Sequence, residues 1–327
     1  MEIRQIEAFA AVHQSGSVTA AARLLDRSQP VVSRQLQDLE QELGFQLFVR
    51  TRPQVTLTEQ GRQFLEEARH VLAGLNHLEV RSREIAAGKS RSVRVAASLT
   101  LGAGLMPVVM ARQEPLLRES GQQMQLDVLP AKDIVQCLID GHADVAFTSL
   151  PVDLGRCHLH WCAQAPSVIA VPANHPLADQ QVISSFQLLN ETVITLSNAT
   201  RMHHRLATAL LHPARPANYR QIIASNSLSA MMMVGQGAGF ALADPCLAAL
   251  MHPHNVVFRK FESYVPYTFG AVSYAERSLS DEVLALVEEV RNYAFLHVPG
   301  IVEGDKSGIP VITPVVSAGT AFDRAEV

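Results

Sequence analysis

Apolar residues recur three and four positions apart through residues 1–44, and this spacing predicts a series of short amphipathic helices. Ser17 and Ser28 stand where N-cap residues are favoured, so we expect a second helix over residues 18–25 and a third that begins after Ser28. Pro30 falls in the first turn of that third helix, where its missing N–H costs nothing. Two helices joined by a tight turn form a helix-turn-helix pattern.

Two short runs of strand-forming residues follow, over residues 45–49 and 54–57. Arg50 and Arg52 lie in the turn between these runs. The pattern predicts a small β-wing tipped with arginine. Helices and wing together predict a winged helix-turn-helix DNA-binding domain over residues 1–58.

A long helix is expected over residues 59–91, because apolar residues recur every seven positions at Phe64, Val71, Leu78 and Ile85. This stripe favours dimerisation through a linker helix. The alternative is an amphipathic helix that packs on its own domain. We favour the dimer, since a short winged domain offers too little surface to cover so long a stripe.

From residue 93 onward, short β-branched runs alternate with helical stretches, which predicts an α/β architecture with a mostly parallel sheet. The expected strands are 93–97, 125–129, 145–148, 167–171, 193–196, 221–224, 240–243 and 267–273. The expected helices are 105–119, 134–141, 185–190, 202–211, 228–235, 245–249 and 280–295.

Prolines in the middle of this part are suited to a crossover between two α/β lobes. We therefore predict one domain over residues 92–298, with lobe I at 92–163 and 268–298 and lobe II at 164–267. The remaining residues, 299–327, contain several Gly and Pro residues and no long apolar repeat, so we expect a loosely held C-terminal tail.

The balance of charges restricts the possible partners. The 327 residues include 27 Lys and Arg against 31 Asp and Glu, a formal charge of −4, which counts against a broad cationic surface for nucleic acid or lipid. Residues 1–58 contain six arginines and six acidic residues, so the expected DNA-binding domain is formally neutral. Its binding must therefore depend on a few positioned contacts and on paired heads.

The number of cysteines and the length of the apolar runs both bear on where the protein acts. Four cysteines are too few for a disulfide scaffold in a chain of this length. No apolar run approaches the ~20 residues that cross a bilayer, and the first residues lack the apolar core of a signal peptide. We therefore expect a cytoplasmic protein without a membrane partner.

The sequence shows no motif for catalysis, for cofactor binding or for metal binding. The glycine-rich run 235–240 follows an expected helix and opens an expected strand, the reverse of a dinucleotide-binding loop. The adjacent His203 and His204 point to different sides of a helix and do not readily chelate one ion. Cys157 and Cys162 leave a thiol-based redox sensor as an alternative, although unremarkable thiols are favoured. We predict no enzyme activity, no cofactor and no metal site.

Residues 17–36, SVTAAARLLDRSQPVVSRQL, resemble the helix-turn-helix of LysR-type transcriptional regulators. The same family pattern continues at 39–40, 43–44, 47–50 and 57–61. The resemblance is dense over the predicted winged domain, and the order of expected elements extends it through the α/β part.

The resemblance implies an α/β fold with an all-α winged helix-turn-helix N-terminal domain and a two-lobed effector domain like a type 2 periplasmic binding protein. It also implies a homotetramer, double-stranded promoter DNA as a partner, and a small-molecule co-inducer between the lobes. Within the family, stretches 171–178 and 237–245 are similar to regulators of opine and arginine catabolism.

The expected recognition helix carries side chains that suit base edges. Gln29 can bond to adenine, Arg34 to guanine and Ser33 to either, while Pro30 can touch a thymine methyl group. Phosphate or minor-groove contacts are expected from the wing arginines and from hydroxyls at helix starts. The expected DNA-binding residues are Thr19, Ser28, Gln29, Pro30, Ser33, Arg34, Arg50 and Arg52. The alternative for Ser28 is a simple N-cap.

Hydroxyl groups follow several expected strands, where open α/β sheets bind ligands. Ser98 and Thr100 precede a glycine-containing turn, an arrangement suited to a carboxylate. Asp244 could meet a cationic group of an amino-acid-like ligand. The expected effector-binding residues are Ser98, Thr100, Thr148, Ser149, Ser197, Thr200, Ser227 and Asp244. Each of them could instead cap a helix.

These features predict a DNA-binding transcriptional regulator that responds to a small carboxylate or amino-acid-like effector. A solute-binding receptor is a rival, because two α/β lobes have that shape. It ranks low, since the sequence carries a DNA-binding head and shows no export signal.

Overall fold

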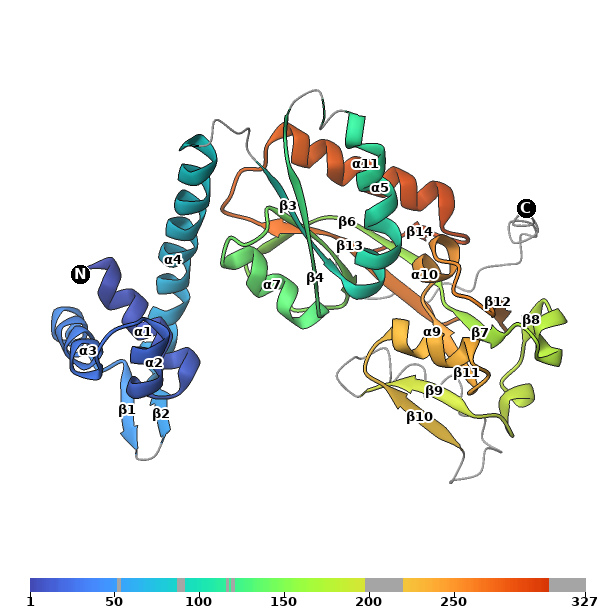
Figure 1. The fold of residues 1–327 in the computed structure, drawn as a ribbon, viewed down its shortest axis with the longest axis horizontal. Helices are drawn as coiled ribbons and strands as arrows, with labels where there is room; N and C mark the ends of the chain where they lie inside the picture. Colours follow the sequence, from blue (N-terminus) through green and yellow to red (C-terminus); the bar gives the residue numbers. More distant parts are fainter. Residues whose placement is uncertain (52–53, 87–91, 116–117, 119–120, 198–219, 306–327) are drawn as a thin grey trace. The chain divides into compact units, whose positions relative to one another are not determined.

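The computed structural model describes residues 1–51, 54–86, 92–115, 118, 121–197 and 220–305. The chain divides into two compact units. One comprises Met1–Lys89 with Ile139–His142, and the other comprises Ser90–Leu138 with Ala143–Val327. Figure 1 colours the chain along its sequence, from blue at the N-terminus to red.

The first unit begins with a head of three helices and a two-stranded wing. The helices are α1 (Ile3–Ser15), α2 (Val18–Leu24) and α3 (Gln29–Leu43), and they enclose a core of buried apolar side chains. The wing strands, β1 (Phe48–Thr51) and β2 (Gln54–Leu57), pair antiparallel. The expected winged helix-turn-helix is therefore present.

Local capping explains where the head helices begin and end. Ser17 Oγ accepts a hydrogen bond from Ala20 N at 3.1 Å, which starts α2. Ser28 occupies the N-cap position of α3, but its side chain makes no cap hydrogen bond. Gly16 and Gly44 end α1 and α3 with φ values of 71° and 77°, a left-handed conformation that glycine adopts without strain.

The long helix α4 (Glu59–Ala86) has two distinct parts. Near its start Phe64 packs against the head core. Further along, Val71, Leu78 and Ile85 are exposed by 47%, 61% and 62%. The seven-residue stripe is therefore divided: its first member stabilises the head, and the other three leave an apolar face uncovered within the described unit.

In the second unit, the strands of the described residues form two six-stranded sheets. The first sheet has the order β14-β6-β13-β5-β3-β4. Its strands are β3 (Val93–Ser98), β4 (Met124–Leu129), β5 (Val145–Leu150), β6 (Cys157–Pro166), β13 (Pro266–Tyr274) and β14 (Val302–Glu303). β3 runs parallel to β4 and β5, whereas β13 runs antiparallel to β5 and β6. The sheet is therefore mixed and not mostly parallel as expected. β6 leads the chain out to the second sheet and β13 brings it back, so these two neighbouring strands run antiparallel.

The second sheet has the order β10-β9-β11-β7-β12-β8 and is mixed as well. Its strands are β7 (Val168–Pro172), β8 (Val182–Ile183), β9 (Val193–Leu196), β10 (Gln221–Ala224), β11 (Phe240–Ala243) and β12 (Val256–Phe261). All eight expected strands are present, and β6, β8, β12 and β14 were missed. The chain crosses between the sheets from β6 to β7 and from β12 to β13, where Ser167 N donates to Val265 O at 2.8 Å.

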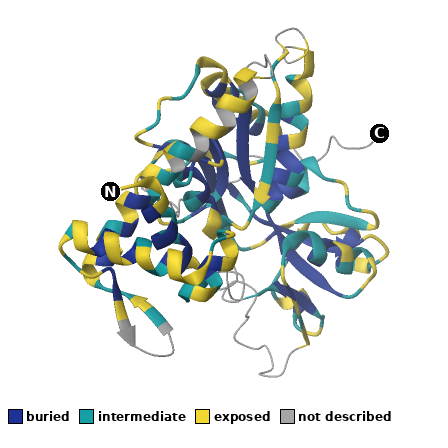
Figure 2. Cartoon of the chain, turned by 60° about the vertical axis from the view of Figure 1, so that its left-hand side comes forward, coloured by how far each residue is buried: buried dark blue, intermediate teal, exposed yellow. Residues whose placement is uncertain are grey.

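Helices cover the sheets, whose central strands are buried in Figure 2. In the first sheet, α5 and α11 supply apolar side chains to one shared core. Within the described ranges of this unit, the helical elements are η1 (Leu101–Leu105), α5 (Met106–Arg112), α7 (Ala131–Ile139), η2 (Pro176–Asp179), η3 (Phe186–Leu188), α9 (Ser227–Gly235), α10 (Pro245–Leu250) and α11 (Asp281–His297). The expected helix over residues 202–211 lies outside the described residues. Among the described residues, no helix has the length and apolar character that a membrane crossing requires.

The tail expected after residue 298 does not begin as a loose segment. β14 pairs antiparallel with β6, with Val302 opposite Gln164 and Glu303 opposite Ala163. The sequence did not predict this strand, because its two pairing residues, Val302 and Glu303, lie between Gly300 and Gly304, and glycines indicated a loose segment. Residues 306–327 lie outside the described part of the chain.

Candidate DNA-reading and effector sites

The first turns of α3 present the residues expected to read DNA. Gln29, Pro30 and Arg34 are exposed, and Ser33 is half-buried. The Arg34 side chain is 84% exposed, and its Nε lies 3.9 Å from Asp38 Oδ2. Such an exposed pair contributes little free energy, so Arg34 can leave it to meet a base edge. The outward sides of the head helices are exposed over long stretches in Figure 2.

The expected phosphate contacts lie at helix starts and on the wing. Thr19, near the start of α2, and Ser28, just before α3, are both exposed. Amide groups at helix starts combine well with such hydroxyls to hold a phosphate. Arg50 belongs to β1, and Arg52 lies outside the described residues.

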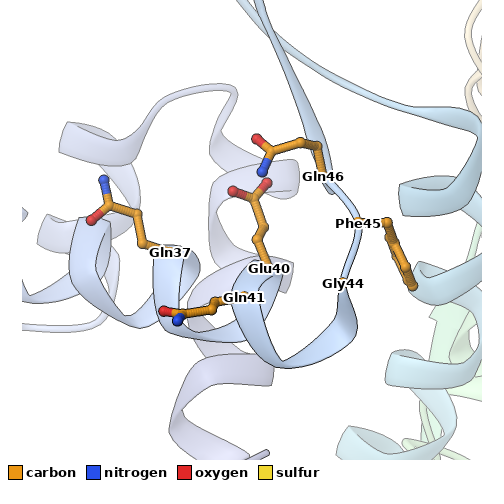
Figure 3. Close-up of a pocket in the computed structure, with 6 residues that line it drawn as sticks. All are labelled: Gln37, Glu40, Gln41, Gly44, Phe45 and Gln46. Atoms are coloured by element: carbon orange, nitrogen blue, oxygen red, sulfur yellow. The ribbon is translucent and has the colours of Figure 1, made fainter.

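A hollow of about 430 Å³ lies at the other end of α3 (Figure 3). It is lined by Gln37, Glu40, Gln41, Gly44, Phe45 and Gln46. The buried Glu40 carboxylate accepts hydrogen bonds from Leu47 N at 2.8 Å and from Phe48 N at 3.4 Å. These bonds fix the turn from α3 to the wing, and the hollow results from that turn. Because Gln29 opens the opposite end of α3, the hollow is not part of the expected DNA-reading surface.

In the second unit, strand register separates the expected effector residues. Side chains alternate between the two faces along a strand. Ala97, Phe147 and Phe269 point into the apolar core that α5 and α11 share. We call this side of the first sheet the core face. Their neighbours Ser98 and Thr148 therefore point to the opposite side, which we call the polar face.

The polar face carries buried polar side chains on the neighbouring strands β3, β5, β13 and β6. Ser98, Thr148, Thr268 and Gln164 are only 5%, 0%, 2% and 3% exposed. Thr268 lies opposite Gln164 in the register. Gln164 Nε2 donates to Tyr264 Oη at 2.8 Å, whereas the Thr268 hydroxyl has no hydrogen-bond partner within the described chain. Buried hydroxyls are nearly always bonded, so this one requires a partner from outside the described residues.

The other two hydroxyls of this row have only long hydrogen bonds. Ser98 Oγ accepts from Ser149 N at 3.3 Å, and Thr148 Oγ1 donates to the Ser149 carbonyl at 3.4 Å. Both distances exceed the usual 2.7–3.2 Å range. The polar face therefore has hydrogen-bonding capacity that the chain itself uses poorly.

Of the four residues in this row, the sequence analysis named Ser98 and Thr148 but not Gln164 and Thr268. Each missed residue is polar and stands between apolar neighbours in a strand. Gln164 was overlooked because β6 was not among the expected strands. Thr268 belonged to an expected strand, but its face could not be known without the register.

The core face holds a separate polar cluster whose members bond to one another. Thr100 Oγ1 lies 3.2 Å from Tyr267 Oη, and Ser149 also bonds to Tyr267. Asp244 Oδ1 accepts from Leu247 N at 2.8 Å as the N-cap of α10. Burial raises the pKa of Asp244 to about 6, although hydrogen bonds from Leu247 and Thr100 oppose this shift. The geometry gives Asp244 the capping role that was the alternative to a ligand contact.

The remaining expected effector residues lie on the second sheet. Ser197 follows β9, is half-buried, and its N–H donates to the Ala224 carbonyl at 2.8 Å. Ser227 is the first residue of α9, but Asn226 is the N-cap, whose Oδ1 accepts from Ser229 N. Thr200 lies outside the described residues.

The cysteines of β6 do not suit the redox alternative. Cys157 and Cys162 are five residues apart on this strand, which at ~3.3 Å per residue separates their Cα atoms by about 16 Å, far beyond the ~7 Å limit for a disulfide. Burial raises the pKa of both thiols to about 11, so little reactive thiolate forms. Within the described ranges, no group of His, Cys, Asp or Glu is arranged to hold a metal ion.

A winged helix-turn-helix joined through a long helix to a two-sheet α/β unit with a buried polar face defines a ligand-responsive DNA-binding transcriptional regulator. Residues 3–62 match the model of the bacterial regulatory helix-turn-helix proteins of the LysR family, and residues 86–294 match the LysR substrate-binding domain. The chain belongs to the LysR family, and the expected resemblance is confirmed. This is a family of transcriptional regulators, not of enzymes.

Similar proteins include regulatory proteins of Rhizobium and Agrobacterium. OccR of Rhizobium meliloti, an octopine catabolism/uptake operon regulatory protein, is 28% identical over 293 residues, 90% of this chain and 96% of the relative. The regulatory protein NocR of Agrobacterium fabrum is 29% identical over 277 residues, 83% of this chain and 90% of the relative.

Solved structures share the fold. A full-length OxyR variant from Pseudomonas aeruginosa, which carries one cysteine-to-aspartate substitution, has a TM-score of 0.60 at 22% identity, and the match covers 89% of this chain and 95% of that one. Full-length CbnR in complex with its target DNA has a TM-score of 0.58 at 24% identity, with coverage of 89% and 99%. At these identities the likeness establishes the architecture alone.

Proposed function

We propose that this regulator binds two-fold related promoter sites as a homotetramer, a dimer of dimers, and responds to a small amino-acid-like carboxylate held on the polar face of the first sheet. The observation that carries the effector proposal is the buried polar row, in which the Thr268 hydroxyl has no partner within the described chain. A regulator of bacterial promoters acts in the cytoplasm, where we place this protein.

The proposed organisation follows from the elements. Residues 1–58 form the DNA-binding head and 59–91 the linker and dimerisation helix. For the effector domain, 92–298, we propose lobe I at 92–166 and 266–298 and lobe II at 167–265, two to three residues from the expected bounds, which keeps β6 and β13 whole. The tail is 299–327. The matches to the family models at 3–62 and 86–294 support this division.

In the proposed complex, α3 reads base edges with Gln29, Pro30, Ser33 and Arg34. Thr19, Ser28 and the wing arginines Arg50 and Arg52 contact phosphates or the minor groove; these four residues complete the set. The exposure of the α3 side chains supports this assignment.

The test of base reading is Arg34→Ala, with Arg62→Ala on α4 as a control that removes an exposed arginine elsewhere. We expect Arg34→Ala to weaken binding of a duplex selected from a random pool by about 1–3 kcal/mol, selectively at one base position. A mobility-shift titration on the selected and a scrambled duplex measures this. Equal loss on both duplexes contradicts the role of Arg34.

Pairing of heads is proposed to use the exposed face of α4. Val71, Leu78 and Ile85 lie seven residues apart and are exposed in the single chain, which suits burial against a second copy of the helix. Leu78→Glu should shift the sedimentation of the protein toward a smaller species at micromolar concentration. Glu79→Gln, next to it, should leave sedimentation unchanged. Unaltered assembly of Leu78→Glu contradicts pairing through this face.

The effector proposal rests on the chemistry of the polar face. Hydroxyl and amide groups donate well to a carboxylate, and bonds to a charged group are the stronger ones. Ser98, Thr148, Gln164 and Thr268 supply such groups. Thr100 and Ser149 belong to the core-face cluster, and Ser197 and Ser227 lie on the second sheet, so we do not place them around this ligand. The name of the octopine regulator OccR supports an amino-acid-like ligand.

A thermal-shift screen tests this proposal with octopine, arginine, ornithine and benzoate. Ligand at 100 times Kd stabilises the folded state by about 2.7 kcal/mol, which raises Tm measurably. We expect an amino-acid-like carboxylate to raise the Tm of the wild type but not of Thr268→Val. Ser273→Ala, on the same strand but outside the polar row, should keep the shift. No shift with any of the four compounds contradicts the assignment.

A further inference from the structure

The segment 299–305, which we call the strap, lies beyond the matched LysR domain, whose match ends at residue 294. Its two-residue strand β14 is an additional edge strand on the first sheet, next to β6 (Figure 1). Without it, β6 would be the edge of that sheet. The strap therefore covers an edge that the rest of the described unit leaves open.

Five consecutive residues of the strap contact the body of the unit. Gly300 lies against the Pro166 ring, since a Cβ built on it would be 3.1 Å from the ring Cδ, and Ile301 packs on the core. Val302 is opposite Gln164 in the register. The carboxylate of Glu303 pairs with the guanidinium of Arg291 on α11. The backbone N–H of Gly304 donates to the Cys162 carbonyl at 2.8 Å.

These contacts concentrate on the last five residues of β6. This part of β6 carries Gln164, a member of the polar face, and leads through Pro166 into the crossover at Ser167. On its other side it pairs with β13, which carries Thr268 and begins at the second crossover. The strap thus holds β6 at the point where the chain leaves the first sheet for the second.

We propose that the strap is a clamp on the crossover between the two sheets, and that its release loosens β6 from Cys162 to Ser167 without unfolding the unit. A two-residue strand held by few backbone bonds can separate more readily than the central strands, since local opening is easiest where few contacts must break. The clamp does not depend on the identity of the effector. Because the strap lies beside Gln164, release of the strap would alter the proposed effector site first.

Cys162 offers a chemical reporter for the clamp. Its side chain is 5% exposed, and a Cβ built on Gly304 would lie 2.6 Å from its Sγ. Burial and the nearby Asp305 carboxylate raise the pKa of this thiol to about 11, which keeps its alkylation slow. Replacing Gly304 with a larger residue must therefore displace either the strap or the Cys162 side chain.

The experiment measures iodoacetamide labelling of each cysteine in the wild type and its variants under native conditions, by mass spectrometry of the cysteine-containing peptides. The strap is removed in a chain that ends at Val298, and it is displaced in Gly304→Val. The matched control ends at Asp305 and keeps the strap. Cys246, which is 0% exposed in the core, reports on global unfolding.

We expect Cys162 to react at least ten times faster in the strapless chain and in Gly304→Val, and at the wild-type rate in the chain that ends at Asp305. Cys246 should react at the wild-type rate in all of them. Unchanged labelling of Cys162 without the strap overturns the proposal. So does equal acceleration of Cys162 and Cys246, since the strap would then support the whole fold and not a local clamp.

Hydrogen exchange supplies a measurement that does not involve a thiol. The Ser167 amide, which donates to Val265 O, should exchange faster in both strap variants, while amides of the central strand β3 keep their protection. Normal protection at Ser167 overturns the link between strap and crossover even if Cys162 becomes reactive. Both readouts are independent of ligand, so a failed effector screen leaves this test intact.

Discussion

The two faces of the first sheet are built from the same strands yet use polar groups in opposite ways. On the core face, Thr100, Tyr267 and Asp244 form a cluster in which each polar group bonds to another part of the chain. On the polar face, Thr268 has no partner within the described residues, and Thr148 has only a long bond. The difference teaches that burial of a polar residue does not by itself indicate a binding site; the decisive feature is whether its hydrogen bonds are already made.

Neighbouring residues of β13 show the contrast most directly. Phe269 is 0% exposed, and its ring centroid lies 5.9 Å from that of Trp161 and 5.8 Å from that of Tyr267. Thr268, one residue earlier, is 2% exposed but points to the other face. One residue should therefore determine stability, and the other should determine ligand binding.

The largest expected effect is on the core face. Phe269→Ala removes a fully buried ring from a well-packed cluster, so we expect the free energy of unfolding to fall by about 3–5 kcal/mol. Urea unfolding followed by the fluorescence of Trp161, the single tryptophan of the chain, measures this loss. Phe269→Leu should lose much less, because it restores most of the volume. A loss below about 1 kcal/mol for Phe269→Ala would mean that the core face is not the main source of stability.

The head could be predicted from the sequence because its structure depends on local rules. Ser17, Pro30 and Gly44 mark helix ends within a few residues, and their consequences do not depend on distant pairing. The family pattern over residues 17–36 added the function. Exposure of Arg34 then followed from the periodicity of one helix.

The effector unit was only partly predictable, because its key relations are non-local. The assignment of Thr268 to the polar face requires the register between β13, β5 and β6, which no local signal contains. β6 itself was missed, so Gln164 had no predicted place. For Asp244 the sequence left both a cap and a ligand contact open, since the two look identical in sequence, and the structure shows the cap.

An intermediate effect concerns the pH dependence of the core-face cluster. The pKa of Asp244 is raised from its ordinary value of 3.8 to about 6 by burial, so the folded state binds a proton more tightly than the unfolded state. The stabilisation is fully present below pH ~4 and is lost as pH rises through about 6; at ~1.4 kcal/mol per pKa unit it amounts to about 3 kcal/mol. Tyr267 and Cys246 do not titrate in this range, because burial raises the pKa of each well above its ordinary value.

Asp244→Asn tests this directly, since Asn keeps an oxygen that can cap α10 but carries no titrating carboxyl. We expect the difference in unfolding free energy between wild type and Asp244→Asn to change between pH 4 and 7, in favour of the variant at the higher pH. Urea unfolding at half-unit pH steps measures it. A difference that is constant with pH would show that Asp244 keeps its ordinary pKa in the folded chain.

The smallest expected effect on stability, and the sharpest contrast with Phe269→Ala, comes from Thr268→Val. Valine has nearly the same shape, and the hydroxyl it replaces makes no bond within the described chain, so the unfolding free energy should change by less than about 0.5 kcal/mol. Ligand binding should respond differently, because loss of a hydrogen bond to a charged group costs about 1.5–3 kcal/mol, roughly a tenfold or greater rise in Kd. Calorimetric titration with the compound that raises Tm, beside urea unfolding of the same variant, measures both quantities. If Thr268→Val loses as much stability as Phe269→Ala while its affinity is unchanged, the two faces do not divide packing from binding, and the buried polar row belongs to the core after all.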